Sequence, residues 1–179
     1  EAIKEIKTAR DLDPLAPRMA ANVGNLLYKA RKYDQALEEL KKAIELYPEH
    51  IANYAYPVMV YTALGRYEEA LASLQKWEEI EGGEPIIGLA YVYAKWGKRE
   101  EAGEHLKKII ERSEKTYVSS TDIASIYGAL GDFDRAFSWL EKAYSERDVK
   151  LQYNKVEPRF DSLRSDPRFQ ALLKKMNLD

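Results

Sequence analysis

A short motif that recurs about every 34 residues constrains the fold of this chain more than any other feature of its sequence. A glycine opens the motif, an aromatic residue follows two positions later in most copies, and an alanine closes it. The copies span 65–70, 97–102 and 131–136, and an earlier copy at 31–36 lacks only the glycine. The closing alanines are 34, 32 and 34 residues apart. This period is typical of stacked helical hairpins, because one hairpin cannot bury its apolar face alone.

Each copy of the motif lies between two segments whose apolar residues have helical spacing, so the chain divides into four hairpins and two flanking segments. The hairpins span 17–48, 51–81, 84–114 and 117–147, and the flanking segments span 1–14 and 149–179. Gly65, Gly97 and Gly131 are expected to end the first helix of their hairpins in a left-handed conformation. The alanines are expected where the two helices of a hairpin cross closely. The sequence therefore predicts an all-α fold.

The first flanking segment, 1–14, aligns with 35–48 at an offset of 34 residues. It therefore matches the second helix of a truncated repeat. Because such a helix needs a partner to bury its apolar side, we expect the natural protein to extend further toward its N-terminus. A lone capping helix is the alternative interpretation.

The tail contains an internal echo. The hexapeptide Pro-Arg-Phe-Asp-Ser-Leu at 158–163 returns nine positions later as Pro-Arg-Phe-Gln-Ala-Leu at 167–172. The stretch 149–156 is expected to be irregular, whereas Ser165 or Asp166 can cap a last helix that begins at Pro167 and continues to about Met176. This helix would cover the apolar end of the array.

Two features interrupt the regularity of the repeats. Pro57 lies inside a predicted helix, where it removes a backbone hydrogen bond, so we expect a kink or an early 3₁₀ turn. Trp77 stands where the first and fourth repeats have alanine, and the period falls to 32 residues after it. We expect the stacking of hairpins to be disturbed between Trp77 and Pro85.

The composition excludes several classes of function. The chain of 179 residues carries 28 basic and 30 acidic side chains, a net charge of −2, which argues against the basic surface of a nucleic-acid-binding protein. The chain has no cysteine and therefore no disulfide. No apolar stretch approaches the roughly 20 residues of a membrane span, and no signal peptide is visible. We expect a cytoplasmic protein with no membrane contact.

No residues combine into a catalytic, cofactor-binding or metal site. The chain has two histidines, His50 and His105, and only Glu101 lies at ligand spacing from one of them. The paired glutamates lie among lysines and arginines, as on a solvated helix face. Neither a phosphate-binding loop nor a nucleophile elbow is present. We therefore expect no enzyme and no cofactor.

The residues at the repeat positions resemble the signature of the tetratricopeptide repeat (TPR) family. In the first hairpin they are Ala20, Val23, Gly24, Leu27, Ala36, Leu40, Ala43 and Pro48. The family's tryptophan is missing from its place, and the proline that ends the second helix survives only at Pro14 and Pro48. The resemblance covers about 1–147 and implies a right-handed α-solenoid of helical hairpins with a C-terminal capping helix. The tail is similar to the ends of bacterial proteins in which TPRs follow a winged-helix domain, a Ser/Thr kinase or an adenylyl cyclase.

The resemblance also implies a concave groove lined by the first helix of each repeat. Six residues at such positions are the candidate partner-binding set: Asn25, Tyr28, Met59, Ile87, Tyr91 and Lys95. Packing of the apolar members against neighbouring helices is the alternative explanation. The groove positions of the fourth repeat are Val118, Thr121, Ser125, Gly128 and Ala129. Because only Asn25 matches the residues with which chaperone-binding members clamp a terminal carboxylate, we reject that kind of ligand.

The sequence thus predicts a non-catalytic module that binds a peptide or a partner protein in a concave TPR groove, as a regulatory segment of a larger bacterial protein. Self-association is an alternative, because the segment 1–13 could expose Ile3, Ile6, Ala9 and Leu12 to another chain. A helical repeat that binds RNA is a weaker alternative, since it needs a basic groove.

Overall fold

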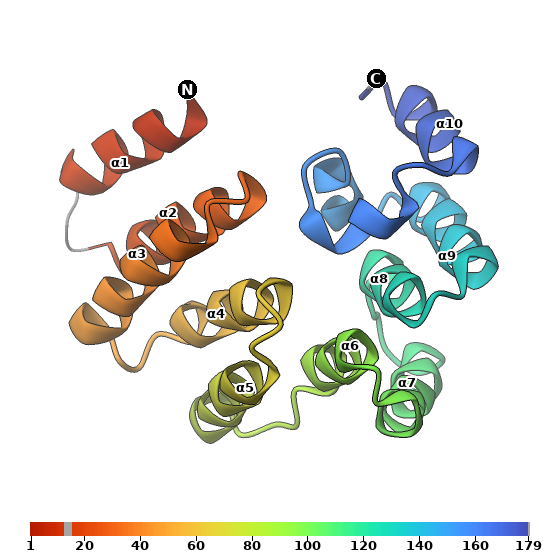
Figure 1. Ribbon diagram of the computed structural model, residues 1–179, viewed down its shortest axis with the longest axis horizontal. Helices are drawn as coiled ribbons and strands as arrows, with labels where there is room; N and C mark the ends of the chain where they lie inside the picture. Colours follow the sequence, from red (N-terminus) through yellow and green to blue (C-terminus); the bar gives the residue numbers. More distant parts are fainter. Residues whose placement is uncertain (13–15, 179) are drawn as a thin grey trace. The chain divides into compact units, whose positions relative to one another are not determined.

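The computed structural model describes residues 1–12 and 16–178, and these residues form α-helices, two 3₁₀ helices and no strand (Figure 1). The backbone divides into two compact units, 1–85 and 86–179. The division falls at the end of the stretch from Trp77 to Pro85 for which irregular stacking is predicted. The end of the predicted segment 1–14 lies outside the described residues, as does Asp179.

Unit 1 contains one leading helix and two antiparallel hairpins (Figure 1). The helices are α1 (Ala2–Leu12), α2 (Pro17–Lys29), α3 (Tyr33–Leu46), α4 (Ala52–Ala63) and α5 (Tyr67–Glu81). Helices α2 and α3 form the first hairpin, α4 and α5 form the second, and α1 packs on α2. Ile3 and Ile6 of α1 are half-buried against the apolar cluster of the first hairpin. The apolar side of α1 is therefore partly covered within the chain.

The first hairpin depends on a close approach of its two helices. Ala36 and Ala43 of α3 are fully buried. A Cβ atom added at Gly24 of α2 would overlap the side chain of Leu40, whose branch carbon lies closer to that position than side-chain atoms pack. Small residues on both helices, Gly24 on α2 and Ala36 and Ala43 on α3, thus allow the helices to cross.

Unit 2 contains two further hairpins and the tail (Figure 1). Its elements are α6 (Ile86–Trp96), α7 (Arg99–Ser113), α8 (Ser120–Leu130), α9 (Phe133–Ser145), the 3₁₀ helices η1 (Val149–Tyr153) and η2 (Pro158–Leu163), and α10 (Pro167–Lys175). Helix α6 pairs with α7, α8 pairs with α9, and α6 packs beside α8. In the tail, η2 contacts α8, while η1 and α10 contact α9. The tail therefore covers both helices of the last hairpin.

The turns follow the motif. Gly65, Gly97 and Gly131 have φ angles of 74°, 82° and 79°, the left-handed conformation that glycine adopts without strain. In the first hairpin, which lacks the glycine, Arg31 takes the same conformation with a φ of 60°. Because a Cβ atom disfavours this region, the first turn is the more strained of the four.

Two local expectations are modified. Helix α4 continues as α-helix through Pro57, so the 3₁₀ turn, one of the two expected consequences of this proline, does not form. The stretch 149–156 contains the 3₁₀ helix η1. The last helix begins at Pro167, and the side chain of Asp166 caps it by accepting a hydrogen bond from the backbone N–H of Arg168.

Candidate functional site

The groove candidates of unit 1 lie on two neighbouring helices. Tyr28 of α2 is buried in the cluster that includes Leu27, and its ring centroid lies 6.0 Å from that of Tyr33. Met59 of α4 is half-buried against the same cluster, and Asn25 is half-buried on α2. The structure thus places Tyr28 and Met59 in the same apolar cluster. Most of the Tyr28 side chain is covered by neighbouring residues and is not available to a ligand.

The groove candidates of unit 2 all lie on α6, at intervals of four residues. Ile87 is half-buried, Tyr91 is buried and Lys95 is exposed. This spacing places the three side chains on one face of the helix. Lys95 and Ile87 are accessible there, whereas the Tyr91 side chain is mainly part of the core.

Two groove positions of the fourth repeat, Ser125 and Gly128, contact the tail. Helix η2 packs on α8, where the Cβ position of Gly128 lies 3.6 Å from a terminal methyl carbon of Leu163. The guanidinium of Arg159 donates a hydrogen bond of 3.4 Å to the hydroxyl of Ser125. Phe160 and Leu163 are fully buried beside Ala124 in the core of unit 2. The α8 face therefore holds a short 3₁₀ segment through its side chains.

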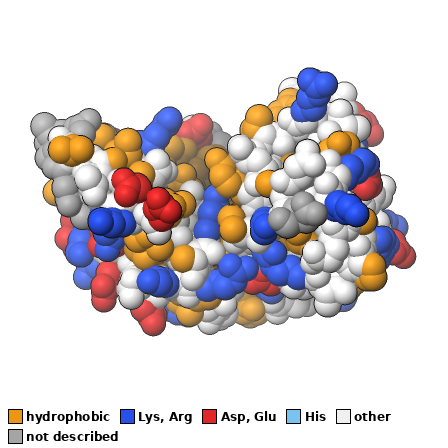
Figure 2. Space-filling view, turned by 90° about the horizontal axis from the view of Figure 1, so that it is seen from above, with side chains coloured by type: hydrophobic (Ala, Val, Ile, Leu, Met, Phe, Trp, Pro, Cys, Tyr) orange, Lys and Arg blue, Asp and Glu red, His pale blue; other side chains and the backbone are white. Residues whose placement is uncertain are grey.

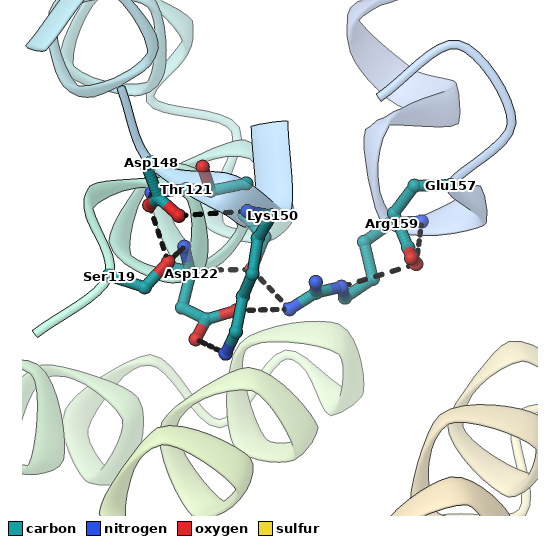
Figure 3. Close-up of polar contacts among 8 residues, drawn as sticks. Ser119, Thr121, Asp122, Asp148, Lys150, Glu157 and Arg159 are labelled. Atoms are coloured by element: carbon teal, nitrogen blue, oxygen red, sulfur yellow. Dashed lines mark hydrogen bonds and ion pairs between the residues drawn. The ribbon is translucent and has the colours of Figure 1, made fainter. Parts of the chain in front are cut away.

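An ionic group lies beside this contact, and we call it the Asp122 cluster (Asp122, Lys150, Glu157 and Arg159) (Figure 3). One carboxylate oxygen of Asp122 lies 2.9 Å from the Arg159 guanidinium, and the other lies 2.5 Å from the Lys150 ammonium. Arg159 also pairs with Glu157 at 3.2 Å. The side chains of Asp122 and Arg159 are only 4% and 9% exposed, so water screens their pairing weakly. The last repeat and the tail are thus joined by a buried ion pair.

A second carboxylate fixes the start of α8. Asp148 accepts hydrogen bonds from the Ser119 hydroxyl at 2.6 Å and from the backbone N–H of Thr121 at 3.0 Å (Figure 3). The backbone N–H of Lys150 donates to its other oxygen at 3.0 Å. Ser119 is in turn the N-cap of α8 and accepts from the backbone N–H of Asp122. These bonds hold the segment after α9 against the first turn of α8.

The two carboxylates differ in what controls their pKa values. Burial alone would raise the pKa of Asp122, but the charges of Arg159 and Lys150 outweigh burial and leave that pKa below its usual value. Burial would also raise the pKa of Asp148, but hydrogen bonds from Ser119, Thr121 and Lys150 lower it on balance. Both carboxylates are therefore held ionised by groups that the fold assembles around them.

No pattern in the sequence predicts the pairing of Asp122 with Arg159. The partners are 28 and 37 residues away in the chain, so no local spacing connects them. The repeated Pro-Arg-Phe motif is the one signal that marks Arg159, because it sets an arginine beside a buried aromatic residue twice.

A separate groove lies in unit 1, along the second helices of its two hairpins. Its volume is about 530 Å³, and it is lined by α3 and α5, with Tyr54, Pro57 and Tyr61 of α4 contributing to it. Lys41, Arg66 and Lys76 lie along it together with Glu38 and Glu69. It is lined by none of the six groove candidates.

The surface carries both signs of charge. On the face seen in Figure 2, basic and acidic side chains lie among hydrophobic ones. Within 1–12 and 16–178, no three His, Cys, Asp or Glu side chains are grouped so that they could hold a metal ion. No helix in the same described ranges has the length and apolarity needed to cross a membrane.

Stacked antiparallel hairpins, small residues at the crossings and left-handed turns define a helical-repeat protein. Family models described as "Tetratricopeptide repeat" match residues 1–51 and 22–85, and also 86–116 and 119–148. The chain belongs to the tetratricopeptide repeat family.

Curated relatives are similar over part of their length. The chain is 25% identical over 135 residues to anaphase-promoting complex subunit 3 of Schizosaccharomyces pombe, which covers 74% of this chain and 20% of that protein. It is 31% identical over 81 residues to Hsp70-Hsp90 organizing protein 1 of Glycine max, which covers 45% of this chain and 14% of that protein. The chain thus spans a fifth or less of the length of each of these two relatives.

Solved structures share the fold. A thermophilic TPR protein of Thermus thermophilus superposes with a TM-score of 0.65 at 22% identity, over 87% of this chain and 88% of that one. YrrB, described as a TPR protein with an unusual peptide-binding site, superposes with a TM-score of 0.52 at 21% identity, over 97% and 92% of the two chains.

Proposed function

We propose that this chain is a non-catalytic binding module that holds a peptide or a short segment of a partner protein on the first helices of its repeats. The observation that carries the proposal is the docking of η2 on α8. There, the groove positions Ser125 and Gly128 receive a short segment of the chain itself, through Arg159 and Leu163. A surface that binds such a segment of its own chain has the chemistry to bind a similar segment of a partner protein.

The names of the relatives support this class of function. YrrB is described by its peptide-binding site, anaphase-promoting complex subunit 3 by its place in a complex, and the Hsp70-Hsp90 organizing protein by the proteins it organises. The partner proposed here is likewise a protein or peptide. Neither a nucleic acid nor a membrane is part of the proposal, and the net charge of −2 supports leaving nucleic acid out.

Within the upstream repeats, the accessible candidates are the residues proposed to contact a ligand. Met59 and Ile87 are half-buried and Lys95 is exposed, so they can contact a ligand without leaving the core. Tyr28 and Tyr91 would act mainly by shaping the surface, because both are buried. Asn25 is half-buried and offers an amide that can hydrogen-bond to a peptide backbone.

The cellular context is also a proposal. We place the module in the cytoplasm, as a regulatory segment of a larger bacterial protein, because its tail resembles the ends of bacterial proteins with an effector domain before their TPRs.

The test is selection of peptides from a displayed library on the wild-type chain, followed by calorimetry on variants. We expect Met59→Glu to weaken the best peptide held by unit 1, and Ile87→Glu the best peptide held by unit 2, each at least tenfold, because a carboxylate on an apolar contact must be desolvated. Lys95→Glu is compared with Lys107→Glu, which changes an exposed lysine of α7. Lys107→Glu should bind as the wild type does. If Met59→Glu, Ile87→Glu and Lys95→Glu also bind as the wild type does, the proposed binding surface is wrong.

Self-association remains a second candidate, because Leu12 of α1 is largely exposed. Against it, Ile3 and Ile6 are already half-buried within unit 1. Light scattering decides between the two: a mass that stays monomeric as concentration rises rejects self-association, and Leu12→Glu should dissociate any dimer formed through α1.

A further inference from the structure

The tail and the last repeat have complementary chemistry. The α8 face that η2 covers carries small and polar groups, among them Ser125, Gly128 and the Asp122 carboxylate. A buried carboxylate is unfavourable without a cation. The tail supplies that cation as Arg159 (Figure 3). Phe160 and Leu163, which follow Arg159 in the chain, are buried in the core of unit 2.

We propose that the segment 157–164 is an internal ligand of the last repeat. It occupies the groove positions of α8 and thereby excludes partner segments of the same chemistry: an arginine, an aromatic residue directly after it, and a leucine three positions further on. This inference rests on the proposed function, since it assumes that the groove positions receive segments of partners.

The contacts identify which features such a partner segment needs. The arginine must reach one oxygen of Asp122, because Lys150 holds the other. The aromatic residue and the leucine must fill the space beside Ala124 and Gly128. An acidic residue in place of the arginine would meet the Asp122 carboxylate and be repelled.

The second copy of the motif does not make the same contact. Arg168 pairs with Asp134 at the start of α9, and the Asp134 side chain is 92% exposed. Phe169 is buried against Phe160, with ring centroids 6.4 Å apart, and packs in the core of unit 2. The groove positions of α8 are therefore covered by the first copy, and the second copy serves as a matched control.

The experiment uses the full chain and a fluorescein-labelled peptide with the sequence of 157–164, Glu-Pro-Arg-Phe-Asp-Ser-Leu-Arg. Binding is followed by fluorescence anisotropy. In the double variant Arg159→Ala/Phe160→Ala the tail is released, and we expect the peptide to bind this variant at least tenfold more tightly than the wild type. The control, Arg168→Ala, should bind the peptide as weakly as the wild type does.

Two further comparisons locate the binding. Adding Asp122→Asn to the released variant should weaken the peptide at least tenfold, and a peptide with Glu in place of its first arginine should not bind. If the released variant keeps its helical circular dichroism but does not bind the peptide, the proposal is wrong. Equal binding by the wild type, the released variant and the control would also overturn it, because the peptide would then bind elsewhere.

A milder variant covers the case in which the double variant loses its helices. Arg159→Ala alone removes the ionic contact and keeps both apolar anchors, so it should bind the peptide severalfold more tightly than the wild type; binding no tighter than the wild type rejects the inference. Failure of this inference can be told apart from failure of the proposed function, because the peptides selected on the upstream repeats are expected to depend on Met59 or on Ile87 and not on the tail. Loss of those peptides on Met59→Glu, with no binding of the tail peptide to any released variant, would leave the module intact and reject only the internal ligand.

Discussion

The two copies of the Pro-Arg-Phe motif have nearly the same sequence and different surroundings. Their aromatic residues, Phe160 and Phe169, are both fully buried. Arg159 is 9% exposed and pairs with a buried carboxylate, whereas Arg168 is 47% exposed and pairs with the exposed Asp134 and with Asp166. Both copies of the Pro-Arg-Phe motif thus bury their aromatic residue, but the strength of the ion pair made by the arginine depends on the helix against which each copy packs.

The difference arises from the element that each copy forms. The first copy forms the 3₁₀ helix η2 on α8, where the acidic partner faces a covered surface. The second copy begins α10 on α9, where Asp134 lies in the exposed first turn. Since solvent weakens charge pairing, the same arginine should stabilise unit 2 far more in the first copy.

The largest expected effect is common to both copies. Phe160→Ala and Phe169→Ala should each lower the free energy of unfolding by about 3–5 kcal/mol, because each leaves a cavity in the core of unit 2. Urea unfolding followed by circular dichroism measures both. A clearly smaller loss for either variant would contradict the equal burial of the two rings.

Removal of Asp122 should have the next largest effect. Asp122→Ala removes a carboxylate that pairs with the buried Arg159, so we expect a loss of about 3 kcal/mol in the same measurement. Asp134→Ala is the matched change in the second copy and should cost under about 1 kcal/mol, as exposed pairs do. Equal losses would show that the Asp122 pair is as well screened as the exposed one.

The pH dependence of stability should reveal the same carboxylate. The pKa of Asp122 is lower in the folded chain than in the unfolded chain, so its contribution is complete above the unfolded pKa of about 4 and is lost as the pH falls through the lower folded pKa. We expect the free energy of unfolding to fall below about pH 4, and to fall less steeply in Asp122→Asn. Urea unfolding measured at a series of pH values from about 5 downward tests this. If the free energy of unfolding depends on pH equally steeply in Asp122→Asn and in the wild type, the prediction is wrong.

The smallest effect belongs to the second arginine. Arg168→Ala should lower the free energy of unfolding by under about 1 kcal/mol, and added salt should shrink the difference, because the Arg168 pair is exposed. Arg159→Ala should cost more, and salt should change that loss much less. A larger loss of free energy of unfolding for Arg168→Ala than for Arg159→Ala would contradict the difference described here between the two copies.

The sequence predicts the repeat fold well, because the signals are local. A glycine that must take a positive φ and an alanine that must let two helices approach are dictated within a few residues of each turn. The hairpin period then follows from their spacing. Arg31 shows the limit of this reasoning, because it takes the left-handed conformation without being glycine.

The sequence predicts the candidate site less completely. The resemblance to the TPR family selects Tyr28 and Tyr91 as groove residues by position, but burial is decided by the neighbouring helices, which cover both. Position along a helix gives the direction of a side chain and not the amount of solvent that reaches it. Met59, Ile87 and Lys95 are therefore the candidates whose side chains a ligand can reach.

By itself, the sequence determined the all-α repeat architecture and the glycine turns, because each depends on short-range backbone and side-chain chemistry. Only the tertiary structure decided that η2 covers the groove positions of α8 and that Arg159, 37 residues from Asp122, becomes its buried partner. A charge pair between distant segments depends on where the chain folds back, and no local spacing in the sequence encodes that meeting.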